Sequence, residues 1–277
     1  ANSGADAVKF QCHIADSESS LEDKFRKPFS YVDRTRYDYW KRMEFTYEQW
    51  GGLKTHAEKS GLEFLCTPFS IEAVELLEQL KIEKWKIGSG EVTLLPLIEK
   101  IAETNKPVFI STGLSTLNEI NEALKIFKKH GNKITIFQCT THYPVLPENV
   151  GLNNIAELHH QFQCPVGFSD HSGTIYPSLA AVTLGAVAIE VHITFSKKMF
   201  GPDVTSSITI EDLVQMCQGI RYIEKVMRYP VDKDLIACKL SDTKKLFERS
   251  VYARESIQKK SVIRDDQVIL LKPGGGF

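Results

Sequence analysis

Residues 85–91, Trp-Lys-Ile-Gly-Ser-Gly-Glu, carry the pattern that decides the fold. The segment begins as a short apolar run and becomes polar only where the run ends, at Ser89 and Glu91. Such a run is typical of a strand in a parallel sheet that is buried on both faces. Six further runs of this kind are spread along the chain, at Ala7–Gln11, Glu63–Thr67, Pro107–Ser111, Lys133–Cys139, Pro165–Ser169 and Ala186–His192.

Amphipathic helical patterns separate most of these runs. Residues 117–127 repeat apolar side chains at steps of three and four, between a Thr116-x-x-Glu119 capping box and Gly131, a typical helix end. Strands that alternate with helices in this way indicate an α/β fold, and the chain is long enough for a (β/α)8 TIM barrel. An open doubly wound sheet also fits the pattern.

Seven runs are one strand short of a closed barrel. Because residues 3–6 resemble the end of a helix that leads into a strand, we expect a first strand and helix to be missing ahead of residue 1. We expect the barrel to occupy residues 1–240. The periodic pattern then fades, and residues 241–277 read as a linker that ends in Lys-Pro-Gly-Gly-Gly-Phe.

The composition excludes several classes of function. The 34 Lys and Arg nearly balance the 35 Asp and Glu, so no field of one sign invites nucleic acid or an anionic membrane. No apolar run approaches the ~20 residues of a membrane span. The six cysteines form no C-x-x-C pair, and neither a G-x-G-x-x-G nor a Walker motif is present. We expect a soluble, cytoplasmic protein without nucleic-acid or membrane partners.

Two lysines, Lys9 and Lys86, lie inside otherwise apolar runs. A buried ammonium group is costly unless it meets an anion, and the sequence shows no evident protein anion beside either lysine. A phosphate group would satisfy both. Hydroxyls at other strand ends could donate to the same anion, although helix capping is the commoner role for any single one of them. These hydroxyls belong to Thr67, Ser89, Ser111 and Ser169.

His171 and His192 lie at the ends of two successive strand runs, and each follows a carboxylate by one or two positions. Adjacent strand ends would bring both imidazoles within reach of one ion such as Mn, Fe, Co or Zn. A lone strand histidine is more often packed in the core, but the pair favours a metal site. Asp203 could approach from the following turn. Glu190 and Tyr143 are candidates for acid–base work.

The segment from Cys12 to Phe45 interrupts the β/α rhythm with many charges and aromatic side chains, among them Tyr39 and Trp40. A long loop after a barrel strand is often a lid or a wall of the substrate site. His13, within this loop, reads as solvated, and we assign it no role.

Eight ordered fragments resemble the motifs of the N-acetylneuraminate (sialic acid) synthases and their legionaminate and pseudaminate relatives. The similarity covers nearly the whole chain, and the fragments keep a consistent spacing. They are residues 9–11, 67–69, 86–91, 106–113, 139–144, 167–171, 190–192 and 201–203.

The resemblance implies a synthase that condenses phosphoenolpyruvate with an N-acylated amino sugar and releases phosphate by C–O cleavage. It implies a divalent metal, Mn2+ or Mg2+, held by His171 and His192. Seven residues would bind phosphoenolpyruvate: Lys9, Gln11, Thr67, Lys86, Ser89, Ser111 and Ser169. The sugar would be held by Thr141, Tyr143 and Asp203, with Glu91 helping to position it. The residues that take part in catalysis would be Lys9, Lys86, Glu91, Tyr143, Glu190 and Asp203.

The same resemblance implies parts that this chain does not carry. The family's first strand bears a catalytic Glu and an Asn-His motif, and a small C-terminal antifreeze-like (SAF) domain follows the Lys-Pro-Gly motif found here at residues 272–274. In the family this domain reaches into the partner's site in a domain-swapped homodimer. We therefore expect residues 241–277 to lead toward such a domain in a longer polypeptide.

Two alternatives and the identity of the sugar stay open at this point. Lys9 or Lys86 could form a Schiff base in an aldolase-type barrel, or the barrel could be an inactive sugar-binding subunit. Thr141 stands where neuraminate-forming members carry Asn, and this replaces an amide by a hydroxyl and a methyl group. This favours a 2,4-diacetamido-trideoxy sugar, while N-acetylmannosamine remains the default.

Overall fold

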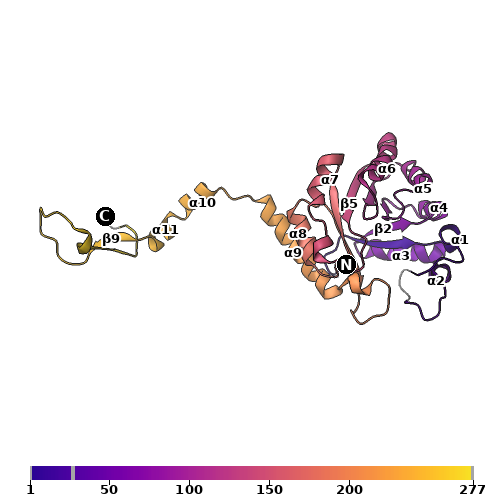
Figure 1. Cartoon of the computed structure of the whole chain (residues 1–277), viewed down its shortest axis with the longest axis horizontal. Coiled ribbons are helices and arrows are strands. Elements are labelled where there is room, and N and C mark those ends of the chain that lie inside the picture. The colour runs from indigo at the N-terminus through magenta and orange to yellow at the C-terminus, as the bar shows by residue number, and fades with distance from the viewer. Residues whose placement is uncertain (1, 26–28, 276–277) are drawn as a thin grey trace. The chain divides into compact units, whose positions relative to one another are not determined.

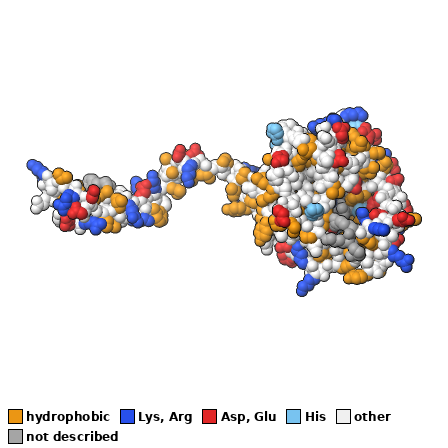
Figure 2. Space-filling model, in the orientation of Figure 1, with side chains coloured by type: hydrophobic (Ala, Val, Ile, Leu, Met, Phe, Trp, Pro, Cys, Tyr) orange, Lys and Arg blue, Asp and Glu red, His pale blue; other side chains and the backbone are white. Residues whose placement is uncertain are grey.

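The structure, a computed structural model, describes residues 2–25 and 29–275. The chain divides into two compact units, Ala1–Lys225 and Val226–Phe277 (Figure 1). The first unit contains the parallel sheet and the helices that connect its strands. On the face shown in Figure 2, acidic and basic side chains are interspersed, as the balanced charge of the sequence predicts.

Eight parallel strands follow one another in the sheet in chain order, which confirms the predicted (β/α)8 class. The first seven correspond to the seven predicted runs. The eighth was not predicted, because its three residues contain a single apolar side chain, that of Ile208. The strands are β1 (Ala7–Cys12), β2 (Glu63–Pro68), β3 (Trp85–Ile87), β4 (Val108–Ser111), β5 (Ile134–Cys139), β6 (Val166–Asp170), β7 (Ile189–Thr194) and β8 (Ser207–Thr209).

The sheet is strongly curled. Lys9 on β1 and Glu190 on β7 are six strands apart in the sheet order, which would separate them by roughly 30 Å in a flat sheet. Their charged groups instead approach to 3.7 Å. Within the described residues no backbone pairing joins β8 to β1, so the curled sheet stays open at that edge. A further strand and helix ahead of residue 1 stays a prediction.

The helices of this unit follow the sequence signals. The predicted capping box is present, since Thr116 N donates to Glu119 Oε2 at 2.7 Å and Glu119 N to Thr116 Oγ1 at 3.3 Å. Gly131 ends this helix with a φ of 81°. Within residues 2–25 and 29–275, no helix has both the length and the apolar character that crossing a membrane requires. The helices are α1 (Ala15–Glu18), α2 (Arg36–Met43), α3 (Tyr47–Lys59), α4 (Ile71–Gln79), α5 (Leu95–Ala102), α6 (Leu117–His130), α7 (Asn154–Phe162), α8 (Tyr176–Thr183) and α9 (Ile210–Arg228).

The hydrophobic core lies between the strands and the helices that surround them. Trp85 and Ile87 of β3, Ile98 of α5 and Phe127 of α6 are fully buried. In Figure 1 helices α4 to α7 succeed one another around the strands. Their apolar faces therefore cover the outside of the sheet, and the carboxyl ends of the strands are left for polar side chains.

The second unit contains two short helices and a hairpin. The helices are α10 (Lys233–Lys239) and α11 (Ser241–Phe247), and β9 (Ser250–Ala253) pairs antiparallel with β10 (Val268–Leu271). The predicted boundary after residue 240 thus lies inside this unit, between its two helices. That residues 241–277 lead toward a further domain stays a prediction, and residues 276 and 277 lie outside the described residues.

Gly167 on β6 offers a test of the strand packing. A Cβ atom there would lie 2.8 Å from Phe137 Cε1 and 2.9 Å from the carbonyl oxygen of Ala188. We expect Gly167→Ala to lower the free energy of unfolding by about 1–3 kcal/mol, because neither neighbour can move freely. In contrast, Gly52→Ala on α3, with no atom within 4 Å of its Cβ, should raise it by about 0.5–1 kcal/mol. Urea unfolding measures both, and equal effects of the two variants would contradict this packing.

Candidate functional site

Side chains from five of the curled strands form a charged cluster around Glu190 of β7. Glu190 Oε1 lies 3.4 Å from Lys86 Nζ of β3 and 3.7 Å from Lys9 Nζ of β1. Ser169 Oγ of β6 donates a hydrogen bond to the same oxygen at 3.3 Å. Lys86 Nζ also donates to Ser111 Oγ of β4. Five residues predicted from separate strand ends therefore form one cluster.

The electrostatics of this cluster are those of an anion site. Burial lowers the pKa of Lys86, whose side chain is only 2% exposed, and Glu190 opposes this effect. Burial would raise the pKa of Glu190, but Lys86 and Lys9 outweigh it and lower that pKa to about 2. Two ammonium groups thus face one carboxylate, and one positive charge remains uncompensated within the cluster. The expectation that no protein anion meets the two lysines is wrong, because Glu190 is that anion.

His171 and His192 lie beside the cluster, with ring centroids 5.2 Å apart. Burial lowers the pKa of each imidazole to about 4, aided at His171 by His192 and at His192 by Lys9. Both rings are therefore uncharged near neutral pH. His171 Nδ1 lies 3.0 Å from the carbonyl oxygen of Thr140, which only a protonated Nδ1 can satisfy. This leaves the Nε2 lone pair of His171 facing the hydroxyl of Tyr143 at 3.2 Å.

These histidines fit the donor set of a metal ion. A neutral imidazole whose other nitrogen donates to a backbone carbonyl is the usual state of a metal-binding histidine. Among the described residues, however, no three His, Cys, Asp or Glu side chains converge. Asp203 acts on His171 through its charge and does not complete such a group. Two protein donors would leave further coordination positions to substrate or water.

Asp170, the carboxylate that precedes His171, has a different role from Glu190. It accepts hydrogen bonds from Ser172 N at 2.8 Å and from Ser178 Oγ at 3.2 Å. It therefore holds the loop after β6 in place. The sequence argument that each histidine has a neighbouring carboxylate at the site is correct only for His192.

The other predicted residues surround this cluster without joining it. Ser89 Oγ accepts a hydrogen bond from Gly113 N at 3.1 Å. Thr67 and Thr141 each have a buried hydroxyl with no partner among the described residues. Gln11 is exposed at the end of β1. The roles of these residues in binding phosphoenolpyruvate or a sugar stay predictions.

Glu91, which follows β3, is a carboxyl group with an altered pKa. Burial raises this pKa to about 7, and Glu18 adds to the rise. Its carboxylate and the ring of Phe69 both flank Gly88, where a Cβ would collide with Glu91 and lie 3.6 Å from the ring. Glu91 is thus able to hold or release a proton near neutral pH.

Sequence reasoning missed His13, which is packed and not solvated. Its ring is stacked between Trp40, at 3.7 Å between centroids, and Phe69, at 4.2 Å. Its Nδ1 lies 2.7 Å from Glu18 Oε1, and its side chain is only 11% exposed. The alternation of the strand gives no signal for it, because Gln11, two residues earlier, is exposed and β1 ends at Cys12.

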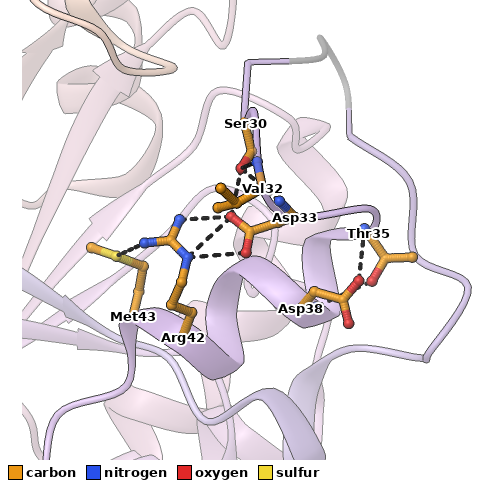
Figure 3. A network of polar contacts seen from close by, with 7 residues as sticks. All are labelled: Ser30, Val32, Asp33, Thr35, Asp38, Arg42 and Met43. Atoms are coloured by element: carbon orange, nitrogen blue, oxygen red, sulfur yellow. Dashed lines mark hydrogen bonds and ion pairs between the residues drawn. The ribbon is translucent and has the colours of Figure 1, made fainter.

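A polar network fixes the helix that carries Trp40 (Figure 3). Thr35 and Asp38 form the capping box at the start of α2. Arg42, one turn later, binds Asp33 through Nε at 3.0 Å and Nη2 at 2.6 Å, and Asp33 also accepts from Ser30 Oγ at 2.6 Å. The predicted lid therefore contains a segment that its own hydrogen bonds order.

Comparisons with known proteins agree with this geometry. The sequence model of the NeuB family matches residues 1–231. The chain is 37% identical over 286 residues to N,N'-diacetyllegionaminic acid synthase of Campylobacter jejuni, across 100% of this chain and 84% of that protein. It is 31% identical to human N-acetylneuraminate-9-phosphate synthase, across 96% of this chain and 74% of that protein. A solved N-acetylneuraminic acid synthetase of Leptospira borgpetersenii superposes with a TM-score of 0.76 at 24% identity, covering 89% and 83% of the two chains, and this likeness shows the fold.

The raised pKa of Glu91 predicts a pH-dependent stability. The folded state holds this proton up to about pH 7, whereas the unfolded carboxyl releases it near 4.5, so the protein loses stability as the pH rises through that window. We expect Glu91→Gln to remove this loss of stability. Removing it should be worth up to about 3 kcal/mol in the free energy of unfolding at pH 8 and little at pH 4. Urea unfolding of metal-free protein across this range measures the difference.

Glu119→Gln is the control for this measurement, because the backbone of Thr116 lowers the pKa of Glu119 and the pH trend should be opposite in sign. A Glu91→Gln effect that does not change between pH 4 and 8 would show that Glu91 has no raised pKa.

Proposed function

Because the chain belongs to the NeuB family, we propose that it is a nonulosonic acid synthase, an enzyme that condenses phosphoenolpyruvate with an N-acylated amino-sugar aldehyde. The relatives that make legionaminic acid and N-acetylneuraminate 9-phosphate support an enzyme of sialic-acid-like sugars. The observation that carries the proposal is the cluster of two ammonium groups and one carboxylate, contributed by β1, β3 and β7. Its excess positive charge suits a small, multiply charged anion.

Phosphoenolpyruvate would bind at this cluster. Lys9 and Lys86 supply the positive charge, and Ser111 and Ser169, already within hydrogen-bond reach of the charged groups, supply hydroxyl donors. Glu190 holds the two ammonium groups together before the substrate arrives. A site prepared in this way stabilises developing negative charge without reorganising during the reaction.

In the proposed reaction, C3 of phosphoenolpyruvate forms a bond to the aldehyde carbon of the open-chain sugar. Water adds at C2, and phosphate leaves as the C–O bond breaks. Lys9 and Lys86 would stabilise the anionic charge through both steps. Glu91, whose pKa is raised to about 7 by burial, would hold or deliver a proton at the sugar, and Tyr143 and Asp203 would position it.

His171 and His192 would hold the divalent metal. When bound, a metal at this position supplies a Lewis acid for the aldehyde oxygen. The neutral imidazole pair favours Mn2+ over Mg2+, because Mg2+ prefers oxygen ligands. Thr140 fixes the tautomer of His171 through its carbonyl group, so that Nε2 is available as a ligand.

The identity of the sugar and the quaternary structure are also part of the proposal. The legionaminic acid relative has the higher identity of the two synthases compared, which agrees with the preference for a 2,4-diacetamido-trideoxy sugar argued from Thr141. N-acetylmannosamine stays the default substrate of the proposal. The domain-swapped homodimer belongs to the proposed full-length protein.

One observation favours a second function. The pKa of Lys86 is lowered by burial, and a Schiff-base lysine needs such a pKa. Its ion pair with Glu190 opposes this, because the carboxylate favours the charged ammonium. Borohydride trapping with a ketone substrate distinguishes the two, since the condensing reaction forms no imine.

We expect the metal-loaded protein to release phosphate from phosphoenolpyruvate only when an amino sugar is present. A heavy-oxygen label at the bridging oxygen of phosphoenolpyruvate should appear in the phosphate, because the C–O bond breaks. Lys86→Ala should raise the KM for phosphoenolpyruvate at least about tenfold, since losing one side of a buried charged contact typically costs about 2–5 kcal/mol. The matched control is Lys84→Ala, whose partly exposed ammonium pairs with Glu63.

Phosphate release measured with a panel of amino sugars distinguishes between the proposals. Absence of phosphate release with every amino sugar would favour the inactive sugar-binding barrel. A preference for N-acetylmannosamine of more than about tenfold in kcat/KM, roughly 1.4 kcal/mol, would refute the deoxy sugar.

The metal site has its own test. We expect His192→Ala to lose the Mn2+ that the parent binds in equilibrium dialysis, because one of only two protein donors is removed. His160→Ala, an exposed histidine on α7, is the control. If His192→Ala binds Mn2+ with the affinity of the parent, the assignment is wrong.

A further inference from the structure

Three buried polar atoms in the loop after β1 have no hydrogen-bond partner among the described residues: His13 Nε2, Glu18 Oε2 and Trp40 Nε1. Buried polar atoms in folded proteins nearly always have partners, because an unmet donor or acceptor loses its hydration without compensation. One such atom could be an accident of packing. Three on residues in contact indicate that a polar group from outside the described residues completes them.

The three residues form one structural unit. His13 joins them, since its ring is stacked on Trp40 with an interplanar angle of 7° and its Nδ1 contacts Glu18 Oε1 at 2.7 Å. The side chain of Glu18 is only 9% exposed, and one of its two oxygens is used by His13. The other oxygen can accept a hydrogen bond, and the indole nitrogen of Trp40 can only donate one.

This unit borders the site described above. The opposite face of His13 is stacked on Phe69 at 4.2 Å, and Phe69 lies beside Gly88 together with the carboxylate of Glu91. Glu18 is close enough to Glu91 to raise its pKa further. The ring of His13 therefore lies one aromatic ring, that of Phe69, away from the carboxyl group proposed to act at the sugar, and Trp40 lies on the far side of His13.

We propose that His13, Glu18 and Trp40 form a polar subsite that binds a neighbouring donor and acceptor on the open-chain amino sugar, as an acylamino group or a vicinal diol presents. Glu18 accepts from the N–H or O–H group of the sugar, and Trp40 donates to its carbonyl or hydroxyl oxygen. His13 is a positioning residue, which holds Glu18 through Nδ1 and Trp40 through the ring stack. The inference rests on the proposed function, because it names a contact of the same substrate.

Two conservative variants test the subsite in the full chain loaded with Mn2+. Trp40→Phe removes the indole N–H and keeps an aromatic ring for the stack, and Glu18→Gln replaces one oxygen by a donor. We expect each to raise the KM for the amino sugar about tenfold or more, which corresponds to about 1.4 kcal/mol. The KM for phosphoenolpyruvate should change less than about twofold, a split that general damage to the fold would not produce.

The matched control is Glu44→Gln, a carboxylate of the same loop whose Oε1 already accepts from Ala15 N at 2.7 Å. It should leave both KM values within about twofold of the parent. Binding of the open-chain alcohols of N-acetylmannosamine and of mannose distinguishes the two kinds of group. If the subsite binds the acylamino group, Trp40→Phe weakens binding of the first alcohol only, and if it binds a diol, both alcohols bind more weakly.

Binding without turnover gives a second measurement. Calorimetric titration with the reduced, open-chain alcohol of N-acetylmannosamine, which has no aldehyde to react, should show the same weakening in both variants. If the parent protein turns over the sugar, and both variants bind the alcohol and react as the parent does, the subsite is wrong and the proposed function stands. A parent that neither releases phosphate nor binds the alcohol overturns both.

Discussion

The ion cluster of Glu190 with Lys9 and Lys86 is the contact on which the arrangement of the site depends. A buried ammonium group without a counter-charge is strongly unfavourable, so Lys86 can be fully buried only where a carboxylate reaches it. Glu190 reaches it from β7 only because the sheet curls until β7 faces β1. The curvature of the sheet and the burial of the lysines therefore require each other. A sheet with the same strands but less curvature would leave Lys86 unpaired.

The position of Glu190 beside the two lysines also determines the surroundings of His171 and His192. His192 follows Glu190 by two positions on the same strand, so the placement of the carboxylate also places the ring beside His171. Burial, aided by the positive charge of Lys9, lowers the pKa of His192 to about 4 and keeps the ring neutral. The cluster thus separates two environments within a few ångströms, one cationic and suited to an anion, the other formed by uncharged nitrogen donors.

Much of this arrangement was predictable, and the misses have physical causes. The apolar runs identified seven strands and placed Lys9, Lys86, His171 and His192 at one end of the sheet, because the carboxyl ends of parallel strands share an edge. The eighth strand was missed since Ile208, between Ser207 and Thr209, is its single apolar residue and makes no apolar run. The pairing of Glu190 with the lysines depends on curvature between strands far apart in sequence, which no local pattern encodes. His13 was missed because it lies just beyond the end of β1, among the many charged residues of the following loop.

The hydrogen bond from His171 to Thr140 comes from the main chain of the segment after β5. A carbonyl oxygen is present whatever side chain occupies the position, so replacements at residues 140 and 141 leave the tautomer of His171 unchanged. The neighbouring hydroxyl of Thr141 is therefore free to vary over evolutionary time without disturbing the imidazole. The backbone of residue 140 and the side chain of residue 141 thus act separately, and the side chain can change while the imidazole of His171 keeps its tautomer.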